Sequence, residues 1–285
     1  MEGSSTSGYR WNIAVDGSDA ALNAFNIVFE ELKRDDDYII VSHVFSNDKK
    51  HPLIQFKQEN IKLSYEGKLI GTHSSKWTMI WEHLEKNLTT KEHVNKIAKD
   101  MDSDIMAMGY VGRKGPKSDP TLLGSAVEYM AHNPVCPALI VKSPEKRVDK
   151  ESGGFRWLVC SDGSEKSYKA LRETLKIISK DDDEVVILVV TLASIDAKQI
   201  QEDTNKIFDE EGVSNHRFET LDRDSDEKTS DAIVDYINID ETEYIDFVVV
   251  SNQGCGYSKH TQKKYLGKVA SGVLCKSKAN IVLVF

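Results

Sequence analysis

An internal repeat constrains the fold of this chain more than any other feature of its sequence. The stretch WNIAVDGSDAALNAF begins at Trp11, and WLVCSDGSEKSYKAL begins 146 positions later at Trp157. The two copies stay in register without a gap to about Phe45, so that Asp16-Gly17-Ser18 falls on Asp162-Gly163-Ser164. A match of this length favours two domains of ordinary size, rather than one large domain, within the 285 residues.

Each copy predicts a strand, a tight turn and an amphipathic helix. Apolar residues follow the turn at helical spacing in both copies: Leu22, Phe25, Phe29 and Leu32 in the first, and Tyr168, Leu171, Leu175 and Ile178 in the second. Acidic runs at Asp35–Asp37 and Asp181–Asp183 then predict a turn into a second strand, YIIVSHVF or EVVILVVT. Because such apolar density is typical of a strand covered on both faces, each half opens as a parallel β-α-β unit.

The later part of each half continues the alternation of strands and helices. DIMAMGYVG aligns with DFVVVSNQG at an offset of 142, as does ALIV from Ala138 with NIVL from Asn280. In the second half, the periodicity predicts a helix around DAKQIQEDTNKIFDEEG, an extended HRFETL and a helix around TSDAIVDYI. In the first half, PLIQFKQENIKLSYEGKLIGTH has weak periodicity, and we predict a helix there before the alternating KWTMIWEHL.

The alternation predicts an α/β fold with two tandem doubly wound domains, each a parallel sheet flanked by helices. We predict a disordered tail over residues 1–8, domains over 9–143 and 155–285, and an exposed linker over 144–154, where the charged KSPEKRVDKESGG is punctuated by proline and glycine. In such folds, ligands bind at the carboxyl ends of the strands. The turn after the first strand of each half is therefore the first place to look for a site.

Composition excludes several classes of protein. The longest apolar run is far shorter than the ~20 residues that span a bilayer, and MEGSSTSG lacks the pattern of a signal peptide, so we expect a cytoplasmic protein. The formal charge of −9 opposes binding to nucleic acid. The four cysteines form no C-x-x-C pair, so we assign them neither to a metal site nor to a disulfide. They are Cys136, Cys160, Cys255 and Cys275.

A glycine-rich loop in the first half carries the strongest candidate for a binding site. The strand IMAM runs into GYVGRKGPKSDPTLLGSAV, which ends at Gly124-Ser125 and a new helix. Glycines would let the backbone approach a ligand, and the unpaired N–H groups of a helix start favour an anion such as phosphate. In the alternative interpretation, Ser125 and Glu128 form a capping box and the glycines only shape turns.

Three motifs in this order resemble those of the universal stress protein family. They are VDGSDAA after the first strand, SHVF at the end of the second, and Gly109-x-x-Gly112 followed at a distance by Gly124-Ser125. The resemblance covers nearly the whole chain as two tandem copies. It implies a five-stranded parallel sheet of order 3-2-1-4-5 in each half. It also implies an adenine nucleotide, ATP, ADP or AMP, as ligand, which could carry Mg²⁺.

The resemblance also implies which residues hold the nucleotide. It places Asp16 and Val44 by adenine and ribose, Met108 and Gly109 along the nucleotide, and Gly112, Gly124 and Ser125 at the phosphates. On physical grounds alone, we add the basic residues of the same loop, which could neutralise phosphate charge: Arg113, Lys114 and Lys117.

The spacing of the loop departs from the family's nucleotide-binding pattern. Eleven residues separate Gly112 from Gly124, and eight separate Gly115 from Gly124, and neither number is that of the family pattern. The departure affects the contacts at the phosphates more than those at the adenine end.

The second copy departs further. Ser251 replaces the first glycine, twelve residues lie between Gly254 and Gly267, and Lys268 stands where the family has Ser or Thr. We therefore predict a degenerate or altered site in the second half. Nucleotide binding is expected mainly in the first half.

Family domains pair through their last strands, and both halves end in an apolar strand whose free edge would invite aggregation. We therefore predict that the two halves form an intramolecular pseudo-dimer, with further self-association left open. No protein partner can be named from the sequence.

Binding is favoured over catalysis. We find no nucleophile motif, metal-ligand cluster or catalytic carboxylate pair, and we interpret His43 and His132 as structural residues. The first hypothesis is an ATP-binding sensor or regulator of the stress response. The alternatives are a protein-interaction module of the same fold without nucleotide binding, and a slow ATPase.

Overall fold

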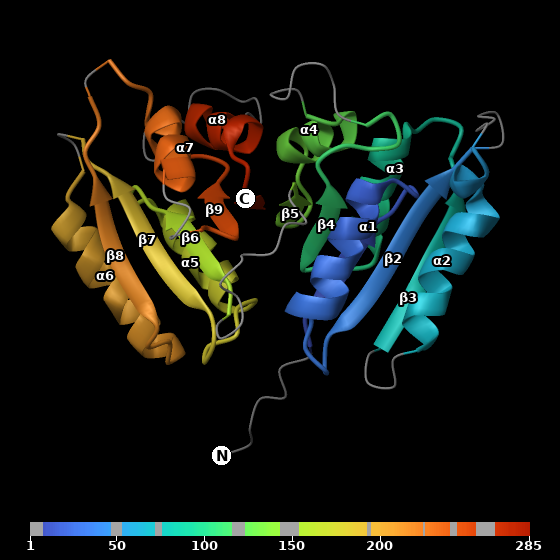
Figure 1. Ribbon diagram of the computed structural model, residues 1–285, viewed down its shortest axis with the longest axis horizontal. Helices are drawn as coiled ribbons and strands as arrows, with labels where there is room; N and C mark the ends of the chain where they lie inside the picture. The colour runs from blue at the N-terminus through green and yellow to red at the C-terminus, as the bar shows by residue number, and fades with distance from the viewer. Residues whose placement is uncertain are drawn as a thin grey trace. The chain divides into compact units, whose positions relative to one another are not determined.

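The computed structural model describes residues 8–46, 53–71, 76–115, 123–142, 154–192, 195–224, 226–239, 244–254 and 266–285. The chain divides into two compact units, the first formed mainly by residues up to Val141 and the second mainly by residues from Lys142 onward (Figure 1). Apart from Gly8 and Gly154, the residues predicted as a tail and a linker lie outside the described ranges. Within those ranges, none of the helices combines the length and the apolar character needed to cross a membrane.

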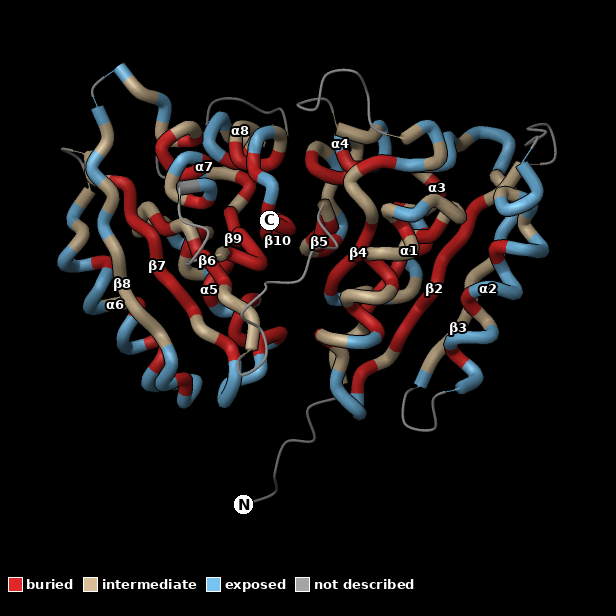
Figure 2. The backbone as a smooth tube through the Cα atoms, viewed as in Figure 1, coloured by how far each residue is buried: buried red, intermediate tan, exposed pale blue. Residues whose placement is uncertain are grey.

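The first unit contains a five-stranded parallel sheet in the order β3-β2-β1-β4-β5. Its strands are β1 (Arg10–Ala14), β2 (Tyr38–Phe45), β3 (Lys76–His83), β4 (Ile105–Gly109) and β5 (Ala138–Val141). The predicted strand order is confirmed. The central strands are almost wholly buried (Figure 2), which explains their nearly continuous apolar sequences.

Helices cover both faces of this sheet: α1 (Asp19–Asn26), α2 (Gln58–Ile70), α3 (Thr90–Asp100) and α4 (Ser125–His132). The predicted helix after β1 is present, but it continues past Asn26 as a π-helix over Ile27–Leu32. Phe25 and Phe29 stack at 4.9 Å between ring centroids, and both are buried, as is Leu32. A spacing of three and four residues does not distinguish an α-turn from the wider π-turn, so the sequence pattern could not reveal this change.

Helix α2 confirms the prediction made from a weakly periodic segment. Its buried residues are Ile61, Tyr65 and Leu69, spaced four apart along one face. Leu63 and Ile70 are 66% and 65% exposed, and these apolar residues on the outer face weaken the pattern. A short 3-10 helix over Ile54–Phe56 precedes α2.

The second unit repeats this architecture with the parallel order β10-β9-β6-β7-β8. Its strands are β6 (Arg156–Cys160), β7 (Glu184–Val190), β8 (His216–Leu221), β9 (Phe247–Ser251) and β10 (Asn280–Val284). Its helices are α5 (Glu165–Leu175), α6 (Ala197–Glu211), α7 (Thr229–Ile239) and α8 (Lys268–Lys276). The helices predicted for the middle of this half are confirmed as α6 and α7.

The repeat has physical causes in both units. Gly17 and Gly163, the central glycines of the repeated Asp-Gly-Ser turns, have positive φ angles of 83° and 76°, which a residue with a side chain rarely adopts. Gly8 and Gly154 also correspond, because the main chain of each lies directly against the acidic turn that precedes the second strand. The residue conservation between the two copies therefore reflects their backbone conformation.

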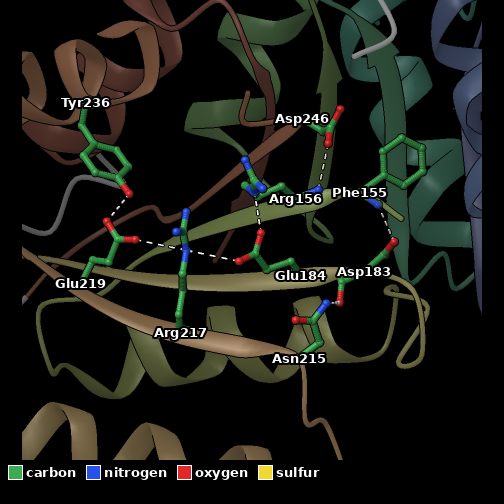
Figure 3. A network of polar contacts seen from close by, with 9 residues as sticks. All are labelled: Phe155, Arg156, Asp183, Glu184, Asn215, Arg217, Glu219, Tyr236 and Asp246. Carbon is green, nitrogen blue, oxygen red and sulfur yellow. Dashed lines mark hydrogen bonds and ion pairs between the residues drawn. The ribbon is translucent and has the colours of Figure 1, made fainter. Parts of the chain in front are cut away.

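The second unit carries a ladder of charged side chains across β6, β7 and β8 (Figure 3). Glu184 accepts from Arg156 Nε at 2.5 Å and lies 3.2 Å from Arg217 Nε. Arg217 also pairs with Glu219 at 3.1 Å, and Tyr236 of α7 donates to Glu219. These half-buried pairs neutralise one another on the sheet, so we assign them a structural role.

Candidate functional site

A cavity of about 390 Å³ lies at the carboxyl ends of the strands in the first unit. Strands β1, β2 and β4, the loops after β1 and β4, and the starts of α3 and α4 contribute its lining. Seven of the residues implied by the family resemblance line this one cavity: Asp16, Val44, Met108, Gly109, Gly112, Gly124 and Ser125. The fold thus brings together residues that are far apart in the sequence.

Asp16 links the turn after β1 to the loop after β4 through hydrogen bonds. Its Oδ1 accepts from the Ser18 amide at 3.0 Å and from Ser18 Oγ at 2.6 Å. Its Oδ2 accepts from the Arg113 amide at 3.1 Å. A carboxylate oxygen has two lone pairs, so Oδ2 can accept one further hydrogen bond from a ligand.

Packing leaves no room for a side chain at Gly109 and little room for one at Gly112. A Cβ on Gly109 would lie 2.5 Å from the carbonyl carbon of Ala20, because α1 packs directly on β4. A Cβ on Gly112 would lie 2.9 Å from Asp16 Oδ2. The resemblance implied a nucleotide-binding role for both glycines, and the structure adds a packing reason that is independent of any ligand.

We expect Gly109→Ser to lower the free energy of unfolding by about 1–3 kcal/mol, because the new side chain must displace the backbone of α1. The second unit provides the matched control, since Ser251 occupies the corresponding end of β9. Ser251→Gly should change stability by less than about 1 kcal/mol. Urea unfolding followed by tryptophan fluorescence measures both, and an equal effect of the two variants would contradict the packing argument.

The start of α4 presents unpaired amides to the cavity. The Gly124 amide donates to the Tyr110 carbonyl at 3.0 Å, and the Glu128 amide donates to the Gly124 carbonyl at 3.0 Å. Ser125 is therefore the first residue of α4. A capping box would instead need Ser125 to be the residue that directly precedes the helix. The amides of residues 125–127 have no acceptor within the helix, and all three residues line the cavity. This arrangement favours an anion.

The start of α3 lines the same cavity, and our sequence analysis did not include it. Thr89 and Glu92 form a capping box, in which the Thr89 amide donates to Glu92 Oε2 at 2.6 Å. Lys91 lines the cavity, and its Nζ lies 5.2 Å from the centroid of the Tyr129 ring on α4. The T-x-x-E pattern could have located this helix start in the sequence.

Arg113 lies at the Asp16 side of the site and is not part of the cavity lining. Its Nε donates to the Asp16 carbonyl, and its Cζ lies 5.6 Å from the centroid of the Phe56 ring. Burial lowers the pKa of this guanidinium, while the negative charge of Asp16 opposes that shift. The side chain therefore supports the turn that carries Asp16.

The structure describes one of the other two basic residues of the predicted set. Lys114 is exposed and is not part of the cavity lining, and Lys117 lies outside the described residues. Among the described lining residues, Lys91 is the one lysine. Among the described residues, Lys91 of α3 is therefore the cation expected nearest to a bound anion.

His43 is a structural residue that also lines the cavity. Its Nδ1 lies 2.7 Å from the Val15 carbonyl oxygen, so this nitrogen donates and carries a proton. Its ring lies against Trp81 with centroids 4.9 Å apart, and the residue is buried. The predicted structural role is consistent with these contacts.

Comparison with known proteins agrees with the architecture. Residues 11–142 match the model of the universal stress protein family. A universal stress protein from Archaeoglobus fulgidus is 18% identical, with a TM-score of 0.68 over 96% of this chain and 97% of that chain. A solved structure from Pseudomonas aeruginosa, described as that of a universal stress protein, is 11% identical, with a TM-score of 0.59 over 97% of this chain and 93% of that chain.

A further solved structure is a universal stress protein in complex with cAMP, 21% identical, with a TM-score of 0.36 over 46% of this chain and 96% of that chain. A search of curated sequences found no significant match. The N-terminal unit matches the universal stress protein family, and the second unit repeats the same fold.

Proposed function

We propose that the N-terminal unit binds an adenine nucleotide, ATP in the first instance, and that this binding serves a regulatory role in the stress response. The observation that carries the proposal is the convergence of two helix starts and Lys91 on one cavity that also presents Asp16. An anion would be held at one end and a hydrogen-bond donor at the other. A nucleotide has both features.

The phosphates would lie against α3 and α4. The unpaired amides of residues 125–127 at the start of α4 favour negative charge, and the dipoles of α3 and α4 add to their effect. Lys91 supplies a full positive charge from α3, and the Ser125 hydroxyl supplies a further donor from α4. These groups come from different elements, so the fold itself places them around a phosphate chain.

The nucleoside would lie between Asp16 and the apolar wall of the cavity. Val44 and Met108 are 6% and 4% exposed, and they offer apolar contact to a base. The remaining acceptor capacity of Asp16 Oδ2 suits a ribose hydroxyl or the adenine amino group. Mg²⁺ would accompany the triphosphate as its counter-ion.

Occupancy would give the unit a means of sensing the nucleotide. A bound nucleotide would contact two loops and two helices at once. Ordering of these segments on binding would change the surface at the carboxyl end of the sheet. A partner that recognises this surface would then respond to the concentration of ATP.

We expect Lys91→Ala to weaken ATP binding about tenfold, because it removes the charge-assisted contact nearest to the phosphates. Lys99→Ala is the matched control, since Lys99 is exposed in the last turn of the same helix and does not line the cavity. Calorimetric titration of ATP into the full chain measures both affinities. Equal affinities for the two variants would contradict the placement of the phosphates, and absence of binding to the wild-type chain would contradict the proposal as a whole.

A further inference from the structure

A second and larger cavity, of about 750 Å³, lies at the carboxyl ends of the strands in the second unit. Strands β6, β7 and β9, the loop after β7, and the starts of α7 and α8 contribute its lining. It occupies the same place in its unit as the nucleotide cavity does in the first. The residues that line it are of a different chemical kind.

Long aliphatic side chains line part of the second cavity. Its lining includes Leu188, Leu192, Ile195, Ile233 and Leu266. No leucine or isoleucine is among the described residues that line the first cavity. The larger volume and the longer aliphatic side chains together suit a ligand with an extended apolar part.

The polar side chains beside the loop after β9 already bond to the protein. Lys166 Nζ donates to Asn252 Oδ1 at 3.1 Å and to Gln253 Oε1 at 2.7 Å. Ser251 Oγ donates to the Gln253 carbonyl at 3.1 Å. This loop corresponds to the glycine-rich loop of the first unit, and its internal bonds leave it less suited to a phosphate chain.

The two cavities have their lysine on helices that do not correspond. Thr90 and Thr229 are the first residues of α3 and α7, so Ser230 stands where the first unit has Lys91. Lys268 is the first residue of α8, where α4 has Ser125. A lysine at a helix start opposes the helix dipole unless an anion lies beside it. Lys268 is the one cation among the described lining residues.

We propose that the second cavity binds a fatty acid, with its carboxylate at Lys268 and the start of α8. The alkyl chain would extend along the aliphatic wall formed by β7 and α7. A single carboxylate matches the one lysine of the lining. Other polar residues, among them Asp162, Asn252 and Gln253, line the cavity at the ends of β6 and β9. The two units would then bind two different ligands through one fold.

Titration of decanoate and dodecanoate into the full chain, below their micellar concentrations, tests this proposal. Both should bind, and each added methylene should tighten binding roughly fourfold, the value for transfer of one CH₂ group from water. Decyltrimethylammonium has the same chain with a cationic head and should not bind. Failure of dodecanoate to bind, or equal binding of the cation, would overturn the proposal.

Variants separate the head group from the chain. Lys268→Ser installs the side chain found at the start of α4 and should weaken dodecanoate binding about tenfold. Lys276→Ser, in the last turn of the same helix and outside the cavity lining, should change it less than about twofold. Ile195→Gln should weaken binding several-fold by making the aliphatic wall polar. Unchanged affinity in Lys268→Ser would overturn the assigned position of the carboxylate.

Competition distinguishes the two sites. Saturating ATP should leave dodecanoate affinity unchanged, because the proposed ligands occupy separate cavities. Displacement of dodecanoate by ATP would overturn the assignment to the second unit. The nucleotide proposal is tested by Lys91→Ala, so either proposal can fail while the other stands.

Discussion

Asp37→Ala is expected to lower the free energy of unfolding by about 3 kcal/mol, although Asp37 lies far along the chain from most of the groups it holds. The carboxylate is 3% exposed. It accepts from the Tyr9 amide at 2.8 Å, from Trp11 Nε1 at 2.9 Å and from the Arg34 amide at 3.0 Å. Alanine would leave these three donors unpaired in a poorly hydrated place, and each unpaired buried donor costs about 1–3 kcal/mol.

The second unit contains the same contact. Asp183 accepts from the Phe155 amide at 2.6 Å, from Trp157 Nε1 at 2.9 Å and from the Ser179 amide at 3.0 Å (Figure 3 shows the contact with Phe155). Asp183→Ala should therefore destabilise its unit by a similar amount. A similar loss of stability in both units would show that the loss comes from the hydrogen bonds of this aspartate and not from its neighbours in the chain.

Neighbouring aspartates provide matched controls within the same acidic runs. Asp36 and Asp181 are exposed, so Asp36→Ala and Asp181→Ala should change stability by less than about 0.5 kcal/mol. Urea unfolding monitored by circular dichroism measures all four variants. If Asp37→Ala proved as mild as Asp36→Ala, the buried Trp-Asp contact could not be the reason for the third aspartate in each run.

The sequence repeat could predict the strands and helices because its repeated residues have local physical roles. Ser18 caps α1 through its hydroxyl, which accepts from the Ala21 amide at 3.3 Å. Asp16 binds the amide two residues further on, and Asp37 closes the acidic turn. Such short-range contacts leave a pattern in the sequence, and two copies of the pattern make it visible.

The strand order could not be derived from these patterns. It depends on the direction of each crossover between strands, which no residue in the strands specifies. The family resemblance supplied the order 3-2-1-4-5, and the structure confirms it in both units. The π-helix after α1 also escaped prediction, because the apolar spacing of Phe25 and Phe29 fits either kind of turn.

The candidate site was predictable on the side of the glycine-rich loop and not on the side of α3. Gly109, Gly112 and Gly124 recur at recognisable distances. The capping pattern of Thr89 and Glu92 marks the helix start that carries Lys91, but it gives no sign that this helix start lines a site. Only the fold brings α3 beside α4. For Arg113 the sequence was misleading. Its place in the loop suggested a contact with phosphate, but its side chain donates to the Asp16 carbonyl.

Gly124 is a poor choice for testing where the phosphates bind. A Cβ there would lie 2.9 Å from the Tyr110 carbonyl oxygen, so any side chain disturbs the loop whether or not a ligand binds. Gly267 has the same constraint in the second unit, with the Asn252 carbonyl oxygen at 3.0 Å. Loss of ATP binding in Gly124→Val would therefore not distinguish a damaged loop from a blocked site.

Ser125→Glu avoids this difficulty, and we expect it to weaken ATP binding roughly a hundredfold. Ser125 is an exposed residue at the start of α4, where a carboxylate interacts favourably with the helix dipole by about 0.3–1 kcal/mol. The variant should thus fold at least as well as the wild-type chain. The same carboxylate would occupy the place proposed for a phosphate, remove the hydroxyl donor and repel the triphosphate.

Ser64→Glu is the matched control, because Ser64 is an exposed residue of α2 that does not line the cavity, and the change in net charge is the same. Calorimetric titration should give one ATP per chain for the wild type and for Ser64→Glu, with affinities within about twofold of each other. Unchanged affinity in a folded Ser125→Glu chain would remove the phosphates from the start of α4. A stoichiometry of two would show that the second unit binds ATP as well.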